Sequence, residues 1–142
     1  MAIKQLSVFV ENKPGKLLPM VKALSDAQVN IRAMSIADTQ DFGILRLIVS
    51  DEKKAKEILS DYSIVTSIDV IAVKISDKAG ALYGVLDALG EAGINIEYTY
   101  AFTASSDFAA YAVMRVEDND AAEKALHAKG FATLKESDIY EI

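Results

Sequence analysis

The sequence predicts an α+β protein built from two consecutive units, each with the element order strand, helix, strand, strand, helix, strand. Three observations predict this. The chain of 142 residues repeats itself along nearly its whole length. Apolar residues alternate in some segments, as in half-buried strands, and recur at helical spacing in others. Residues 63–75 contain no Pro or Gly, so no flexible linker is expected between the copies. We therefore expect two domains, residues 1–68 and 69–142, packed together.

The repeat is clearest around two short loops. Asn12-Lys13-Pro14-Gly15-Lys16-Leu17 recurs 65 positions later as Asp77-Lys78-Ala79-Gly80-Ala81-Leu82. At the same spacing, Val29-Asn30-Ile31 matches Ile94-Asn95-Ile96. The spacing grows slightly further along the chain, as insertions of one or two loop residues would cause. The chain is therefore a duplication of one unit of about 70 residues.

The first copy begins with a strand in which Leu6, Val8 and Val10 alternate with more polar residues. Further along, either Ser50 or Asp51 can cap the second helix. The remaining elements predicted for this copy are a helix with apolar positions Leu17, Val21 and Leu24, strands at 31–37 and 44–49, and a second helix with apolar positions Ala55, Ile58 and Leu59.

The second copy repeats this pattern. Gly93 and Gly130 each stand just before an apolar residue, which predicts a helix end closed by a left-handed glycine. The predicted elements are a strand at 70–75, a helix with the inner face Leu82, Val85, Leu86 and Leu89, strands at 94–101 and 109–116, a helix at about 121–128 and a last strand near 133–140.

This βαββαβ order is the ferredoxin-like arrangement, an antiparallel sheet with both helices on one face. One such unit buries little core for its size and leaves two open sheet edges. Joining two units reduces both weaknesses.

Composition excludes several classes of function. With 15 Lys and Arg against 21 Asp and Glu, the net charge of −6 disfavours nucleic acid and anionic membranes as partners. The chain has no cysteine, which excludes disulfides, thiolate metal sites and cysteine nucleophiles. His127 is the single histidine, so neither a catalytic triad nor a His/Cys metal set can form. We expect His127 on the surface, no metal or other cofactor, and no enzyme activity.

Sequence patterns typical of nucleotide binding, RNA binding, secretion and membrane insertion are also missing. The phosphate-binding glycine motifs are absent, and the third strand of each copy lacks the basic and aromatic pattern of RNA-binding sheets. The first residues do not resemble a signal peptide, and no apolar run is long enough to span a bilayer. We therefore expect a soluble, cytoplasmic protein.

The loops before the two first helices are the best candidates for a binding site. Gly15 and Gly80 let the backbone turn tightly and approach a ligand closely. The amides of the following helical turn point outward at the positive end of the helix dipole, which suits a carboxylate. The alternative is that both glycines only turn the chain into a helix.

The ordered set Asn/Asp-x-x-Gly-x-Leu, an apolar helix, and then Val/Ile-Asn-Ile resembles the ACT domain, a regulatory module that binds small molecules. The resemblance covers about 140 residues in both copies and implies a tandem pair without a catalytic domain. It further implies that units pair, often into a continuous sheet, and bind amino acids between them. The ligand then touches the first loop of one unit and the second strand of its neighbour.

The positions that match this motif form the candidate site. Asn30 and Asn95 can offer a donor and an acceptor to a zwitterion, or can simply serve as turn residues. Arg32 can hold a carboxylate and Glu97 an ammonium group, although both can also be solvated strand charges. The candidate ligand-binding residues are Asn12, Lys13, Pro14, Gly15, Lys16, Leu17, Asn30, Ile31, Arg32, Asp77, Lys78, Ala79, Gly80, Ala81, Leu82, Asn95, Ile96 and Glu97.

Two functions are compatible with these observations. The first is a homodimeric amino-acid sensor of the ACT type, with the ligand at the interface between units. The alternative is a non-catalytic regulatory subunit that docks on a metabolic enzyme and binds no ligand itself.

Overall fold

A computed structural model describes residues 2–103 and 109–140 of the chain. The chain divides into two compact units, one formed by residues 4–68 and the other by residues 1–3 and 69–142. We call them the N-terminal unit and the C-terminal unit. The domain boundary at residues 68 and 69 remains our proposal.

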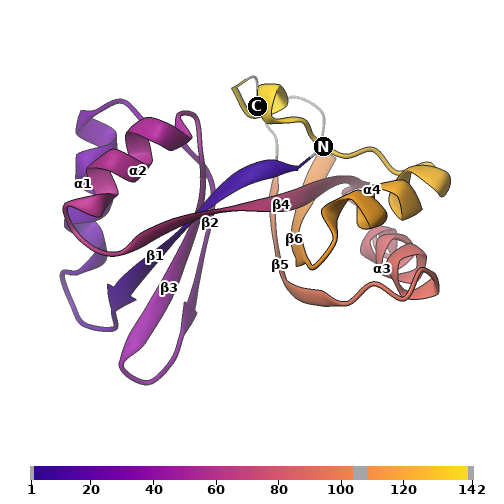
Figure 1. The fold of residues 1–142 in the computed structure, drawn as a ribbon, viewed down its shortest axis with the longest axis horizontal. Helices are drawn as coiled ribbons and strands as arrows, with labels where there is room; N and C mark the ends of the chain where they lie inside the picture. Colours follow the sequence, from indigo (N-terminus) through magenta and orange to yellow (C-terminus); the bar gives the residue numbers. More distant parts are fainter. Residues whose placement is uncertain (1, 104–108, 141–142) are drawn as a thin grey trace. The chain divides into compact units, whose positions relative to one another are not determined.

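The N-terminal unit has the predicted ferredoxin-like order. Its strands lie in the order β2-β3-β1-β4, and β3 pairs antiparallel with both β1 and β2. Helices α1 and α2 pack side by side against this sheet (Figure 1). The elements are β1 (Ile3–Glu11), α1 (Leu17–Asp26), β2 (Ile31–Asp38), β3 (Phe42–Val49), α2 (Glu52–Ser60) and the beginning of β4 (Val65–Ser76).

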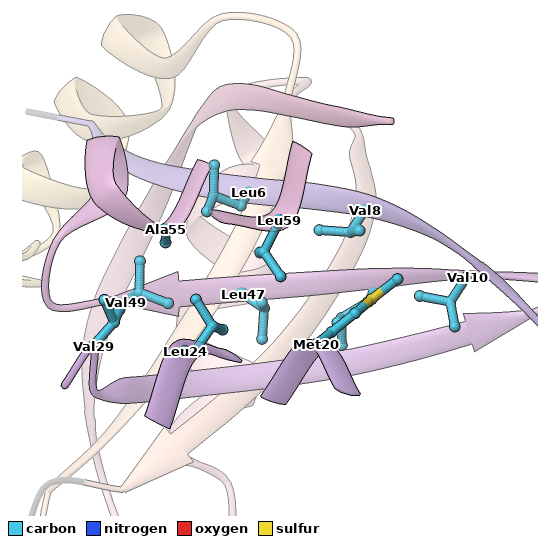
Figure 2. Close-up of a cluster of buried hydrophobic side chains, with 11 residues drawn as sticks. Leu6, Val8, Val10, Met20, Leu24, Val29, Leu47, Val49, Ala55 and Leu59 are labelled. Carbon is cyan, nitrogen blue, oxygen red and sulfur yellow. The ribbon is translucent and has the colours of Figure 1, made fainter. Parts of the chain in front are cut away.

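The core of this unit lies between the sheet and the two helices. The predicted alternation in β1 is confirmed, because its even-numbered apolar side chains point into this core (Figure 2). On α1 the buried residues are Met20 and Leu24, whereas Val21 is only half-buried. The buried cluster contains Leu6, Val8, Val10, Met20, Leu24, Val29, Leu45, Leu47, Val49, Ala55 and Leu59.

The C-terminal unit continues along β4, which runs without a break from Val65 to Ser76. The prediction that no flexible linker separates the copies is therefore confirmed. In this unit β6 pairs antiparallel with β4 on one side and with β5 on the other. Its further elements are α3 (Ala81–Glu91), β5 (Ile96–Thr103), β6 (Ala109–Val116), α4 (Asn119–Ala128) and a 3-10 helix, η1 (Glu136–Tyr140).

The last strand predicted near residues 133–140 is wrong. Only Thr133 forms a β-bridge, to Val73, and the chain then turns into η1. The reason is local: Asp138 accepts a hydrogen bond from the Lys135 amide at 2.7 Å through its side chain, and its own amide donates to the Lys135 carbonyl at 3.0 Å. These bonds satisfy the backbone in a turn and leave it unavailable to a strand.

Two smaller predictions for this unit also need correction. The inner face of α3 consists of Val85, Ala88 and Leu89, whereas Leu82 and Leu86 are exposed. The buried face is therefore rotated by part of a turn from the predicted one, and Ala88 takes a place in the core of this unit. Strand β5 begins at Ile96 instead of residue 94, because the amide of residue 94 donates to the Leu89 carbonyl and so closes α3.

The predicted helix ends are confirmed. Gly93 and Gly130 have φ angles of +70° and +85°, and each follows the C-cap residue of a helix. Asp51 rather than Ser50 caps α2, accepting a hydrogen bond from the Lys54 amide at 3.1 Å.

Candidate functional site

The loop between β1 and α1 is held to the sheet by its backbone. The amide of Asn12 donates to the Asp41 carbonyl at 2.9 Å, which fastens the loop to the turn between β2 and β3. Lys13 lies 3.2 Å from Glu11, with Nζ facing Oε2. Gly15 has φ +77° and open space where a Cβ would be. The loop is therefore fixed at its base and open at its glycine.

The equivalent loop of the C-terminal unit has a similar geometry. The Lys78 amide donates to the Ser76 carbonyl at 2.9 Å, and the Ala81 amide donates to the Lys78 carbonyl at 3.2 Å. Gly80 has φ +87° and open space around its Cα. Both copies thus require glycine for the left-handed backbone that starts the helix.

The helices that follow these loops differ from the other two in how they begin. Helices α1 and α3 have no side-chain cap and no acidic residue in the first turn. By contrast, α2 and α4 are capped by Asp51 and Asp118, and each has an acidic residue in its first turn. The first-turn amides of α1, and those of α3 that follow Ala81, therefore have no side-chain acceptor and lie at a positive dipole end that suits an anionic group.

A small cavity adjoins the first of these loops. It has a volume of about 130 Å³ and is lined by Asn12, Lys13 and Leu17 from the loop and α1, and by Ile36 and Asp38 from β2. Pockets that hold small ligands usually measure about 300–1,000 Å³. The cavity in the N-terminal unit alone is thus too small to be a complete ligand site.

The strand opening in the N-terminal unit is fixed by a pair of hydrogen bonds. The Asn30 amide donates to Ser50 Oγ at 2.9 Å, and the Ser50 amide donates to the Asn30 carbonyl at 2.9 Å. The Asn30 side chain remains exposed. The backbone N–H and carbonyl of Asn30 therefore fix the junction between α1 and β2, while its side chain is exposed to solvent.

The strand opening in the C-terminal unit borders a larger cavity, of about 450 Å³. Asn95 and Glu97 line it together with Arg115, Glu117 and Asp118. Arg115 Nε lies 3.3 Å from Glu97 Oε2, and Arg115 Nη1 donates to the Asp69 carbonyl at 3.3 Å. Sequence reasoning missed Arg115, because only the pairing of β5 with β6 brings it beside Glu97.

Arg32 and Glu97 hold the same structural position in the two units. The pairing of β2 with β3 shifts between Ile31 and Ala33, so that Arg32 is the extra residue of a β-bulge. The pairing of β5 with β6 shifts in the same way around Glu97. Bulges redirect side chains and are frequent beside functional sites. The sequence alignment of these two charges therefore corresponds to an equivalence in the fold.

Within each unit, the loop and the strand opening lie apart. Asn12 is bonded to residue 41, before β3, whereas Asn30 is bonded to Ser50, after β3. Eight residues of extended strand separate these two ends by about 25 Å. In the C-terminal unit, β6 separates the two groups in the same way. One amino acid cannot touch both groups of a single unit, so a joint site requires the strand opening of another unit.

His127 is exposed, as predicted, and its Nε2 lies 2.9 Å from Thr133 Oγ1. Among the described residues, no three His, Cys, Asp or Glu side chains are grouped so that they could hold a metal ion. Within the same part of the chain, every helix is too short or too polar to cross a membrane.

Several solved structures are similar to this chain. Protein BT0572 from Bacteroides thetaiotaomicron has a TM-score of 0.91 and 38% sequence identity, with 100% of this chain and 98% of that chain covered. The ligand-free regulatory subunit of aspartate kinase from Thermus thermophilus has a TM-score of 0.66 and 17% sequence identity, with 89% of this chain and 92% of that chain covered. The regulatory subunit of aspartate kinase from Thermus flavus has a TM-score of 0.60 and 17% sequence identity, with 89% of this chain and 91% of that chain covered.

The likeness to the two kinase subunits concerns the fold alone. No curated protein matches the chain. The family described as the ACT domain pair matches residues 1–142, the whole chain. The order of loop, helix and strand opening had indicated the same family, and the ferredoxin-like pattern of both units agrees with it. The chain therefore belongs to the family of ACT domain pairs.

Proposed function

We propose that this ACT domain pair is a cytoplasmic, non-catalytic sensor that binds a free amino acid and acts as a homodimer. The observation that carries the proposal is the contrast between the helix starts. In both units the helix behind the glycine loop is uncapped, whereas the second helix is capped by an aspartate. A ligand carboxylate would supply the missing acceptor at α1 and α3.

The remaining groups suit the rest of an amino acid. An ammonium group needs acceptors, which the exposed amide oxygens of Asn30 and Asn95 and the carboxylate of Glu97 can provide. Because loop and strand opening lie at opposite ends of a unit, the ligand would bridge two units. Arg32 and Glu97 carry opposite charges, so the sites in the two halves would not be equivalent.

A bridging ligand provides a simple mechanism of regulation. It binds the paired arrangement of units more tightly than the separated one, and so shifts the population toward pairing. Two similar structures are regulatory subunits of aspartate kinase, a likeness in fold that is consistent with a regulatory role.

A second candidate is a subunit that docks on an enzyme without binding a ligand. Helix α3 favours it, because Leu82, Tyr83 and Leu86 are large apolar residues exposed along its surface. Such residues are common at protein interfaces. Leu82 belongs to the candidate ligand site as well, so the two proposals make different use of the same helix.

Thermal unfolding in the presence of each of the twenty amino acids tests the sensor proposal. A ligand at 100 times its dissociation constant adds about 2.7 kcal/mol to the free energy of unfolding, which raises the midpoint by several degrees. The sensor proposal predicts a clear rise for one or a few amino acids. If none raises the midpoint, the docking subunit becomes the better explanation, and a pull-down with candidate enzymes is the next experiment.

A further inference from the structure

A ligand-sized cavity lies within the C-terminal unit, where β5 begins and β6 ends. Its volume of about 450 Å³ falls in the range of about 300–1,000 Å³ that is usual for small-molecule pockets. Its wall includes residues of both charges and does not involve the glycine loops. The lining residues include Ile94, Asn95, Glu97, Arg115, Glu117 and Asp118. This cavity is therefore a candidate site that is complete in a single unit.

Arg115 is held in place while part of its guanidinium group stays available. Its Nε lies 3.3 Å from Glu97 Oε2, and its Nη1 donates to the Asp69 carbonyl at 3.3 Å. A guanidinium group has five N–H donors, so these two contacts leave further donors for a ligand. Arginine binds the two oxygens of a carboxylate through paired hydrogen bonds. Arg115 is therefore suited to hold the carboxylate of a ligand in this cavity.

The wall of the cavity has an excess of negative charge. Three carboxylates, those of Glu97, Glu117 and Asp118, line it with one guanidinium group, which leaves a net charge of −2. Glu97 is paired with the guanidinium group, and Asp118 accepts a hydrogen bond from the Ala121 amide at 3.0 Å. Among the described residues, the exposed side chain of Glu117 has neither a hydrogen bond nor an ion pair. Glu117 is therefore the carboxylate most available to a cationic group of a ligand.

The equivalent place in the N-terminal unit is closed. Ser50 follows β3 as Glu117 follows β6, and each precedes the aspartate that caps the next helix. The Ser50 hydroxyl accepts the hydrogen bond from the Asn30 amide, which ties the end of β3 to the start of β2. Ile48, which is 1% exposed, pairs with the residue after the β-bulge, as Arg115 does in the other unit. The free carboxylate and the guanidinium group therefore have no counterpart there, and the two copies differ in the groups that would bind a ligand.

We infer that this cavity is a second binding site, selective for an amino acid with a cationic side chain, such as lysine or arginine. The ligand carboxylate binds Arg115, and the two cationic groups of the ligand lie among the carboxylates, with Glu117 as the main acceptor. The alkyl part of the side chain packs on Ile94. The ligand carries one negative and two positive charges, which complements the excess of negative charge on the wall. This site goes beyond the proposed function, because it requires neither the glycine loops nor the pairing of units.

Calorimetric titration of the wild type with lysine and with norleucine tests the ligand class. The two amino acids share the backbone groups and a similar alkyl chain, but norleucine lacks the side-chain ammonium group. We expect lysine to bind at least about tenfold more tightly, because norleucine loses a charge-assisted hydrogen bond. Absence of lysine binding, or equal affinity for the two amino acids, overturns the inference.

Variants of Glu117 and Arg115 test the roles assigned to them. Glu117→Gln should reduce the preference for lysine over norleucine by about tenfold. Arg115→Met should weaken lysine by about tenfold or more, and should weaken lysinamide, in which an amide replaces the carboxylate, clearly less. Glu57→Gln makes the same change of net charge as Glu117→Gln at an exposed position of α2, and should bind lysine as the wild type does. An unchanged preference in Glu117→Gln, or equal losses for lysine and lysinamide in Arg115→Met, overturns the site.

The double variant Gly15→Ala with Gly80→Ala separates this site from the proposed function. It alters both glycine loops and leaves the wall of the cavity unchanged, and circular dichroism checks that it is folded. Lysine should bind this variant with the affinity of the wild type. Loss of lysine binding in the folded double variant assigns the ligand to the loops and overturns the second site. Lysine binding that the loop changes leave intact and Glu117→Gln weakens supports the second site, even if no amino acid binds at the loops. If the double variant does not fold, Glu117→Gln and Arg115→Met decide the question.

Discussion

Gln28 and Gly93 occupy the same position in the two units, and both have a left-handed backbone, with φ +57° and +70°. Each lies one residue past the C-cap of the first helix of its unit, and their amides donate to the carbonyls of Ser25 and Gly90 at 2.9 and 3.0 Å. Among the non-glycine residues that the structure describes, Gln28 alone has a positive φ. The C-terminal unit thus closes its first helix with a glycine, which adopts the left-handed backbone without strain. The N-terminal unit closes the equivalent helix with Gln28, whose side chain makes this backbone conformation strained.

Gln28→Gly should therefore stabilise the protein. A side chain in this conformation costs about 1–2 kcal/mol, from which the extra flexibility of glycine in the unfolded chain subtracts about half. We expect the free energy of unfolding to rise by about 0.5–1 kcal/mol, measured by denaturant titration. Gly93→Ala should lower it by a similar amount. If the two variants change stability in the same direction, the assignment of strain to Gln28 is wrong.

The aspartate cap of α2 should contribute measurably to stability. Asp51 accepts a hydrogen bond from the Lys54 amide, and its removal leaves that amide without its side-chain partner. We expect Asp51→Ala to lower the free energy of unfolding by about 1 kcal/mol. Asp51→Asn, which keeps an acceptor, should lower the free energy of unfolding by only a few tenths of a kcal/mol. Equal losses in both variants would argue against the cap.

Glu97 should matter more for ligand binding than for stability. Its ion pair with Arg115 is exposed to solvent and contributes at most about 1 kcal/mol. Glu91→Gln is a matched control, because Glu91 is 56% exposed against 52% for Glu97 and is also ion-paired, to Lys129 at 2.8 Å. We expect both variants to unfold at similar denaturant concentrations, and only Glu97→Gln to weaken the response to the amino acid. A loss of response in both would point to a general effect of charge.

The pair of Lys129 and Glu91 predicts a small dependence on alkaline pH. The hydrogen bond to Glu91, together with its negative charge, raises the pKa of Lys129 above its ordinary value of 10.5. A lysine whose pKa is raised by folding stabilises the folded state below its unfolded pKa and loses that contribution as pH rises through the folded value. The difference in stability between wild type and Lys129→Met should therefore vanish when unfolding is repeated well above pH 10.5. A difference that persists there would contradict an electrostatic origin.

Most of the fold could be predicted because the decisive signals are local. Alternation in β1 and a glycine after α3 act within a few residues, and the duplication repeated the order of elements in both copies. The strand predicted near residues 133–140 failed, because the pair of bonds between Lys135 and Asp138 forms a turn that apolar patterning does not reveal.

The candidate site was less predictable than the fold. The loop residues could be named from their glycines, whereas the position of Arg115 beside Glu97 depends on the register of two strands. The distance between loop and strand opening within a unit likewise follows from the length and pairing of β3, which no motif encodes. Sequence patterns identify the groups of residues, but tertiary pairing decides which groups meet.

The central claim is that the loops at Gly15 and Gly80 bind the ligand. Calorimetric titration tests it most directly, with the amino acid found by thermal unfolding as the titrant. The proteins titrated are the wild type and the variants Gly15→Ala, Gly80→Ala and Gly130→Ala. All three glycines have positive φ and open space around Cα, so each alanine should cost a similar stability, of about 1 kcal/mol. Only Gly15 and Gly80 precede an uncapped helix of the candidate site, whereas Gly130 follows α4.

We predict that Gly15→Ala or Gly80→Ala loses at least about tenfold in affinity, which corresponds to 1.4 kcal/mol, while Gly130→Ala binds as the wild type does. Unchanged affinity in both loop variants, or an equal loss in all three, would contradict the claim that these loops bind the ligand.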